Sequence, residues 1–241
     1  LVSALTSSVL TSWANLTVYV LPPTKSIPWS RPVVNKEAIP AIINEADIKY
    51  VTFVFFKKSP RHLSFDNAVK LSNYYENNYS NSRINKVSLC VNPTDKELSE
   101  IIAVSRPDFL QLHGLESPTR VKEIRKKYSL AIIKAIRVKT ELDIRASQQY
   151  NTAADWLLFD AATSEELMPG GNGKSFNWSL LADFNCSLPW MIAGGLTPLN
   201  VANAITQIHP DGVDVSSGVE QTAGIKDTLL IQAFVQSAKI R

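Results

Sequence analysis

The sequence predicts an α/β protein built as a single (β/α)8 TIM barrel. Short, wholly apolar segments alternate with helical segments seven times after residue 48. Strands without polar alternation are typical of a parallel sheet that is buried on both faces. One more strand near residues 16–33 would complete eight units in about 200 to 250 residues, the size of a closed barrel. We therefore expect one barrel domain over residues 1–241, with an irregular region around its first strand.

Each expected strand is a short run of aliphatic, β-branched and aromatic residues, and each expected helix follows one. The strands are expected at residues 51–56, 87–91, 109–112, 131–136, 156–159, 190–193 and 212–215. The helices are expected at residues 65–79, 95–105, 118–128, 140–149, 176–182, 199–208 and 227–239. A further helix at residues 35–46, which Asn35 can cap and Pro40 interrupts, would precede them.

A doubly wound open sheet would show the same alternation of strands and helices. Its usual dinucleotide-binding fingerprint, GxGxxG after the first strand, is absent from the sequence. The composition shows no linker between two halves of the chain. The barrel is therefore the favoured architecture.

Charge and hydropathy argue against two classes of partner. The chain carries 25 Lys plus Arg and 22 Asp plus Glu, and this weak excess gives no footprint for nucleic acid. The basic residues 125–127 are expected on a solvated helix face. Residues 1–24 contain no charge, but the longest apolar run there is only residues 18–21. That is too short for a membrane span or a signal core, so we expect an irregular segment and no membrane partner.

Cysteine usage indicates compartment and metal content. Cys90 and Cys186 are isolated, and no CxxC or His/Cys cluster is present. We expect no structural zinc or other metal site. Two isolated thiols in a large domain suit a reducing compartment, so we expect a cytoplasmic protein.

Polar residues stand where the predicted strands end. Arg61, His113, Asp160 and Asp214 occupy such positions on four different strands. The active site of this kind of barrel lies at the carboxyl ends of its strands. Taken alone, a single Asp at a strand end is more often a helix cap or a loop acceptor, and Arg61 is more often a surface charge.

Two glycine turns follow the last two barrel strands and precede helices. They contain Gly194 and Gly195 in the first turn, and Ser217 and Gly218 in the second. Such glycines can simply form tight turns, but backbone N–H groups at a helix N-terminus also bind phosphate. Because phosphate sites after these two strands are frequent in this fold, phosphate binding is the favoured interpretation.

A third glycine-rich segment lies at residues 170–175. It resembles a P-loop, but the position of the first Walker glycine is occupied by Met168. We reject a nucleotide triphosphatase. Gly171, Gly173 and Lys174 fit better in a mobile lid over a phosphorylated ligand.

Several segments together resemble phosphoribosylanthranilate isomerase of tryptophan biosynthesis. They are FVFFKKSPRHLS (53–64), VNP (91–93), QLHG (111–114), GGNGKSFNW (170–178), AGGL (193–196) and DVSSGVE (214–220). They occur in order between about residues 35 and 239. The resemblance implies a (β/α)8 barrel that converts N-(5-phosphoribosyl)anthranilate to its 1-deoxyribulose isomer by an Amadori rearrangement. It implies a small phosphorylated substrate and neither cofactor nor metal; the chain is expected to act as a monomer or homodimer.

The resemblance also implies roles for single residues. Asp160 matches the acid that protonates the furanose ring oxygen, and Arg61 matches the residue that binds the anthranilate carboxylate. His113 and Asp214 match positions near the ligand. The phosphate would be held by Gly194, Gly195, Ser217 and Gly218.

The chain departs from the family at the general base. The family has a Cys in a Lys-Ile-Cys-Gly segment at the end of the first strand, and residues 29–32 stand there instead. Neither Ser30 nor Arg31 is a competent base without a partner. Cys90 is expected in the core, and Cys186 precedes a strand at the other end of the barrel.

Three functions remain open. The chain is an isomerase with a differently supplied base, or a catalytically impaired barrel that only binds the phosphorylated ligand. The third is another barrel enzyme with the same phosphate module, such as indole-glycerol-phosphate synthase. That enzyme needs catalytic lysines at strand ends, a pattern that Lys57 and Lys134 do not reproduce convincingly.

Overall fold

A computed structural model describes residues 17–20, 48–79, 84–161 and 177–239 of the chain. Eight strands form a closed barrel in sequence order. They are β1 (Thr17–Val20), β2 (Ile48–Val54), β3 (Asn85–Cys90), β4 (Phe109–Leu112), β5 (Ala131–Val138), β6 (Trp156–Ala161), β7 (Trp190–Ile192) and β8 (Gly212–Val215). This confirms the (β/α)8 class that the alternation of strands and helices predicts.

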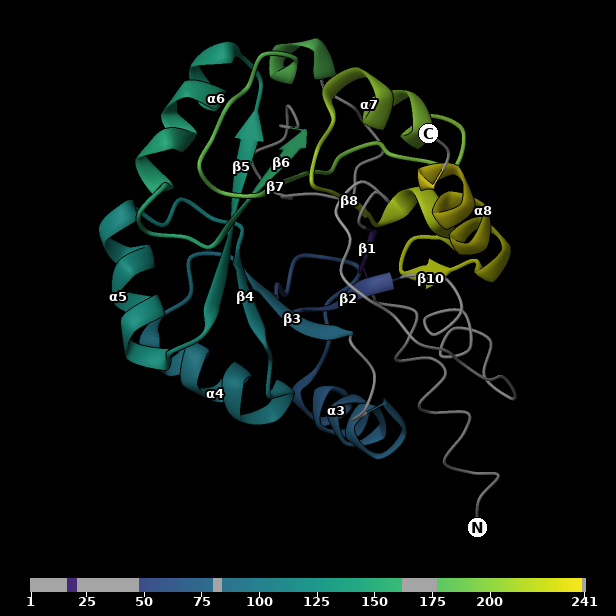
Figure 1. The fold of residues 1–241 in the computed structure, drawn as a ribbon. Coiled ribbons are helices and arrows are strands. Elements are labelled where there is room, and N and C mark those ends of the chain that lie inside the picture. Colours follow the sequence, from purple (N-terminus) through teal and green to yellow (C-terminus); the bar gives the residue numbers. More distant parts are fainter. Residues whose placement is uncertain (1–16, 21–47, 80–83, 162–176, 240–241) are drawn as a thin grey trace.

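Six described helices surround the barrel (Figure 1). They are α3 (Phe65–Tyr79), α4 (Asp95–Ser105), α5 (Pro118–Tyr128), α6 (Glu141–Ala146), α7 (Val201–Ile208) and α8 (Thr228–Ala238). Their starts follow capping rules: Thr94 and Glu97 form a capping box on α4, and Ser117 caps α5 ahead of Pro118. Among the described residues, no helix is long and apolar enough to cross a membrane.

The first strand corrects the expectation of a wholly parallel sheet. β2 to β8 are parallel, but β1 runs antiparallel to both β2 and β8, with Tyr19 opposite Tyr50 on one side and Asp214 on the other. Closing the barrel requires only that the free edges of β2 and β8 find backbone partners. A strand of either direction meets that need, so the apolar pattern of residues 17–20 did not reveal its direction.

Three further segments differ from the expected helices. Residues 140–149 divide into α6 and a 3-10 helix, η1 (Ser147–Tyr150). Of the expected helix at residues 176–182, the described part, residues 177–182, forms only the 3-10 helix η2 (Trp178–Leu181). After β8 come a 3-10 helix, η3 (Ser217–Val219), and a small antiparallel hairpin of β9 (Glu220–Thr222) and β10 (Ile225–Lys226), which the sequence did not predict. The expected helix at residues 35–46 lies outside the described residues.

The alternation of side chains along the strands creates two apolar layers. The larger layer packs between the barrel and the helices, and the smaller one fills the barrel interior. On β6, Phe159 belongs to the outer layer and Leu158 to the inner one, so the next residue, Asp160, points inward. On β8 the neighbours of Asp214 both belong to the outer layer, so Asp214 also points inward. The side chains of Asp160 and Asp214 therefore lie at the top of the barrel interior, where the strands have their C-terminal ends.

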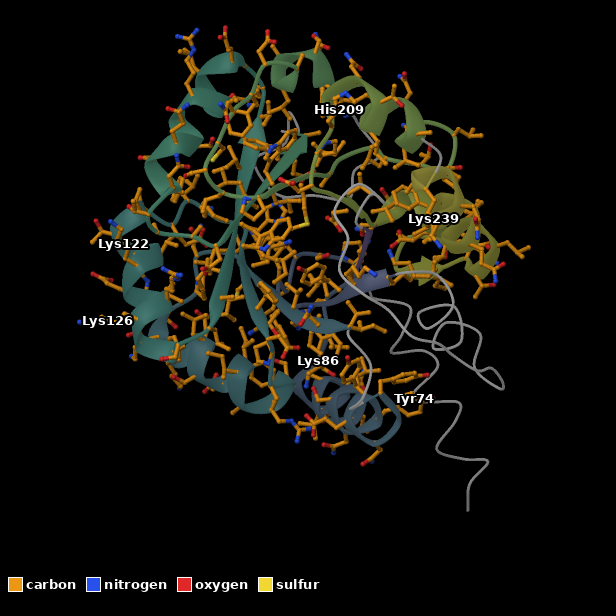
Figure 2. The ribbon with its side chains drawn as sticks, in the orientation of Figure 1. Tyr74, Lys86, Lys122, Lys126, His209 and Lys239 are labelled. Atoms are coloured by element: carbon orange, nitrogen blue, oxygen red, sulfur yellow. The ribbon has the colours of Figure 1, made fainter. Side chains whose placement is uncertain are left out.

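The basic cluster on α5 is a solvated face, as its sequence predicts. Figure 2 shows Lys122 and Lys126 of α5 pointing away from the barrel. Their neighbour Arg125 pairs with Asp155 through a contact of 2.5 Å. This face thus presents no unbroken positive surface.

Candidate active site

A pocket lies at the carboxyl ends of the barrel strands and contains all eight described residues that the sequence analysis selected. They are Arg61, His113, Asp160, Gly194, Gly195, Asp214, Ser217 and Gly218. Apolar walls come from Val54, Phe56, Leu89, Ala193, Leu196 and Val215. The proposed lid residues Gly171, Gly173 and Lys174 lie outside the described residues.

Asp160 sits at the end of β6 and is 2% exposed. Its Oδ2 atom lies 3.2 Å from Nε2 of His113, although the contact lacks the alignment of a hydrogen bond. The other imidazole nitrogen, Nδ1, lies 3.2 Å from Oε1 of Gln111. Gln111 therefore holds the imidazole ring of His113 beside the carboxyl group of Asp160. Because Asp160 also lines the pocket, it can exchange a proton with a ligand bound there.

Asp214 is the second carboxyl group of the pocket. It is 8% exposed, and its Oδ1 atom is buried without a hydrogen-bond partner in the described part of the chain. Burial, and after it the charge of Asp160, raise the pKa of Asp214 well above its ordinary value, while Lys226 acts in the opposite direction. Asp214 is therefore suited to carry a proton and donate a hydrogen bond to a ligand.

Arg61 reaches the pocket from the loop after β2. Its Nε and Nη2 atoms donate to Oε1 and Oε2 of Glu220 at 2.7 and 2.6 Å, a bidentate pair. Nζ of Lys226 donates to the same carboxylate at 2.7 Å. Burial alone would raise the pKa of Glu220, but the hydrogen bonds and charges of Arg61 and Lys226 outweigh it and lower this pKa. A guanidinium held in this way is a fixed site for an anion.

The two glycine turns bring backbone to the pocket. Gly194 and Gly195 have φ values of 83° and 64°, which side chains rarely adopt. Gly218 is packed against the first turn: a Cβ atom added to it would lie 1.8 Å from the carbonyl oxygen of Leu196. The two turns therefore pack against each other as one unit in the lining of the pocket.

Replacing Gly218 with Ala is expected to force the two turns apart. The added methyl group meets the backbone of Leu196, which cannot rotate away as a side chain would. We expect the free energy of unfolding to fall by about 1 to 3 kcal/mol, measured by urea denaturation. Ser217→Ala, which adds no atom, is the control. An unchanged unfolding midpoint for Gly218→Ala would contradict this packing.

A buried ion pair supports the loop that carries His113. Nζ of Lys134 lies 2.9 Å from Oε2 of Glu116 and donates to the carbonyl oxygens of Leu112 and Gly114 at 3.0 and 2.8 Å. Oε1 of Glu116 accepts a hydrogen bond from the backbone N–H of Asn92 at 2.8 Å. The loops after β3 and β4 are thus tied to β5 behind the pocket.

Sequence reasoning missed several of these residues. Glu220 stands in the DVSSGVE segment and Gln111 in the QLHG segment, and these signals could have identified both. Lys226 had no comparable signal. Lys134 was considered only as a catalytic lysine; the structure turns it away from the pocket and pairs it with Glu116.

Neither cysteine lines this pocket. Cys90 is 1% exposed within the outer apolar layer, as predicted, and burial raises the pKa of its thiol. Cys186 lies in the loop before β7, with Sγ 3.0 Å from Oδ1 of Asn151. Residues 29–32, which stand at the family's base position, lie outside the described residues. Within the described ranges, no group of three His, Cys, Asp or Glu side chains could hold a metal ion.

Comparison with known proteins supports the resemblance over most of the chain. The profile of the N-(5'phosphoribosyl)anthranilate (PRA) isomerase family matches residues 33–237. The N-(5'-phosphoribosyl)anthranilate isomerase of Parvibaculum lavamentivorans is 43% identical over 206 residues, which cover 84% of this chain and 93% of the relative.

Solved structures agree with the sequence comparison. Monomers generated from the dimeric phosphoribosylanthranilate isomerase of Thermotoga maritima share 29% identity and a TM-score of 0.66, covering 80% of this chain and 89% of theirs. A phosphoribosyl anthranilate isomerase in complex with reduced 1-(O-carboxyphenylamino)-1-deoxyribulose 5-phosphate gives the same identity, TM-score and coverage. The barrel, its pocket and these matches together show that the chain belongs to the phosphoribosylanthranilate isomerase family.

Proposed function

We propose that this protein catalyses the Amadori rearrangement of N-(5-phosphoribosyl)anthranilate to 1-(2-carboxyphenylamino)-1-deoxyribulose 5-phosphate, a step of tryptophan biosynthesis. One observation carries the proposal: a single pocket combines a buried carboxyl pair, a fixed guanidinium and two glycine turns. The substrate has three matching parts, namely a sugar, a carboxylate and a phosphate. The family match supports the same reaction.

The pocket binds the two anionic ends of the substrate at separate places. The phosphate is held by the N–H groups of the turns at Gly194, Gly195, Ser217 and Gly218, where it needs no cation. The anthranilate carboxylate is held by Arg61, whose planar guanidinium matches a carboxylate. This places the sugar between them, next to Asp160 and Asp214.

The chemistry begins with opening of the furanose ring. Asp160 donates a proton to the ring oxygen as the bond to sugar carbon one breaks, and the nitrogen lone pair forms a protonated imine at that carbon. The Asp160 carboxylate left by this step takes up the proton lost from sugar carbon two, which gives an enaminol and restores the acid. The ketose forms when the proton of the carbon-two hydroxyl is lost and carbon one takes up a proton in exchange. Asp214, with its raised pKa, donates a hydrogen bond to a sugar hydroxyl. His113 keeps Asp160 oriented through its contact of 3.2 Å.

Growth without tryptophan tests this proposal in a cell. A bacterial strain that lacks phosphoribosylanthranilate isomerase should grow on minimal medium when it expresses this chain. The same strain expressing Asp160→Asn should not grow, provided that both proteins accumulate to the same level. Failure of the unaltered chain would favour the alternative, a barrel that binds the phosphorylated ligand without turning it over.

Two further features complete the proposal. Two free thiols, Cys90 and Cys186, support a cytoplasmic location because the cytoplasm keeps cysteines reduced. The dimeric relative from Thermotoga maritima supports a monomer or a homodimer as the assembled form. Sedimentation at micromolar concentration decides between these two states.

A further inference from the structure

Two buried cations share one carboxylate beside the pocket. Glu220 pairs with Arg61 at 2.6 Å and with Lys226 at 2.7 Å. The side chains of all three residues are more than nine-tenths buried. Arg61 and Glu220 are 159 residues apart in the sequence, so this contact joins the loop after β2 to the hairpin after β8.

Lys226 also holds the second glycine turn. Its Nζ atom donates to the carbonyl oxygen of Ser216 at 2.8 Å, and Ser216 directly precedes the turn residues Ser217 and Gly218. Lys226 itself lies on β10, which Figure 1 shows beside the start of α8. One ammonium group therefore contacts the phosphate-binding turn and the carboxylate that orients Arg61.

The charges in this group do not balance. Arg61 and Lys226 contribute two positive charges and Glu220 one negative charge, which leaves an excess of one positive charge. Arg61 has five N–H donors and uses two of them on Glu220, so others remain for an anion in the pocket. Without the charge of Lys226, Arg61 and Glu220 would form a neutral pair and attract an anion less strongly.

We propose that Lys226 is a positioning residue that links the phosphate-binding turn to Arg61 through Glu220 and supplies the positive charge that the anionic substrate requires. This inference rests on the proposed function, because it assigns the turn and Arg61 to the two anionic ends of that substrate. The inference goes beyond the proposed function because it makes Lys226 a shared support, so that binding of the phosphate end and binding of the carboxylate end of the substrate depend on the same side chain.

The inference predicts a pH dependence of substrate binding. Burial lowers the pKa of Lys226 to about 8; the Glu220 carboxylate acts to raise it, the charge of Arg61 lowers it further, and Asp214 acts to raise it. As the pH rises through this value, Lys226 loses its charge and the group of three becomes neutral. KM should therefore increase above about pH 8 while kcat changes little. Arginine stays charged at any such pH, so Lys226→Arg should keep KM constant over this range.

Two substitutions and one control test the inference. Lys226→Met keeps the length of the side chain and leaves Glu220 paired with Arg61. We expect KM for the substrate, and Kd for the reduced product analogue measured by calorimetry, to rise by about tenfold or more. Lys122→Met, on the solvated face of α5, is the matched control and should change neither quantity. Thermal unfolding of each variant verifies that it is folded.

A double substitution shows whether Lys226 acts through Arg61. If Lys226 acts through Arg61, Lys226→Met should weaken binding much less in an Arg61→Met background than in the unaltered chain. Equal losses in both backgrounds would overturn the inference, as would an unchanged KM in Lys226→Met. If neither Lys226 variant folds, the unaltered chain decides: a constant KM between about pH 7 and about pH 9 overturns it. A chain that neither binds the analogue nor isomerises the substrate would instead refute the proposed function.

Discussion

Asp160→Asn is expected to lower kcat by about 10²- to 10⁴-fold, the usual contribution of a positioned general acid. The amide keeps the size of the side chain but cannot give an acidic proton to the ring oxygen. Since Asp160 is buried beside His113, bulk water has little access to this position and cannot readily replace the carboxyl group as the proton donor. Ring opening should therefore become the slow step.

Steady-state kinetics with purified protein measure this effect. Kd for the reduced product analogue should stay within about threefold of its original value, because the amide still fills the same space. Asp183→Asn, an exposed aspartate outside the pocket, is the control and should leave kcat unchanged. If Asp160→Asn retains more than a third of the original kcat, Asp160 is a structural hydrogen-bond acceptor and the proposed acid is wrong.

Glu116→Gln should lower the free energy of unfolding by about 3 to 5 kcal/mol, because it leaves a buried ammonium without its counter-charge. Lys134 and Glu116 each have only 2% of their side chain exposed. An amide also cannot accept hydrogen bonds at both positions from the backbone of Asn92 and Gly114. The loop that carries His113 should loosen as well.

Urea denaturation of Glu116→Gln and of the double variant with Lys134→Met tests this ion pair. Removing both charges should recover much of the loss, and the exposed Glu123→Gln should change stability little. Burial lowers the pKa of Lys134, so the unfolded chain binds more protons than the folded one at high pH. The deficit of Glu116→Gln should therefore shrink as the pH rises. An equal loss in the single and double variants would mean that the pair contributes only packing.

The sequence predicted those parts of the site that depend on the regular barrel. Asp160 and Asp214 could be placed because a strand end fixes both the end of the barrel and, through alternation, the inward direction. The glycine turns could be placed because positive φ values and close backbone contact require glycine. These features depend only on neighbouring residues in the chain, so the residue types at those positions are enough to predict them.

Contacts between distant segments were not predictable in the same way. Glu220 and Arg61 carry opposite charges, as do many other residue pairs in the chain, and no periodicity links their positions. The direction of β1 was missed because backbone hydrogen bonds serve a parallel and an antiparallel strand alike. Lys134 was considered for catalysis because it stands on a strand, but alternation along β5 turns it outward to Glu116.

The most direct test of this account is the turnover of N-(5-phosphoribosyl)anthranilate by the purified chain, followed through the anthranilate chromophore. The account predicts conversion to the deoxyribulose isomer without added cofactor, at a kcat within the ordinary enzymatic range of about 1 to 10³ s⁻¹. Asp160→Asn measured in parallel sets the background. A chain that binds the reduced product analogue but converts substrate no faster than Asp160→Asn would contradict the account and identify a binding protein built on the barrel of an isomerase.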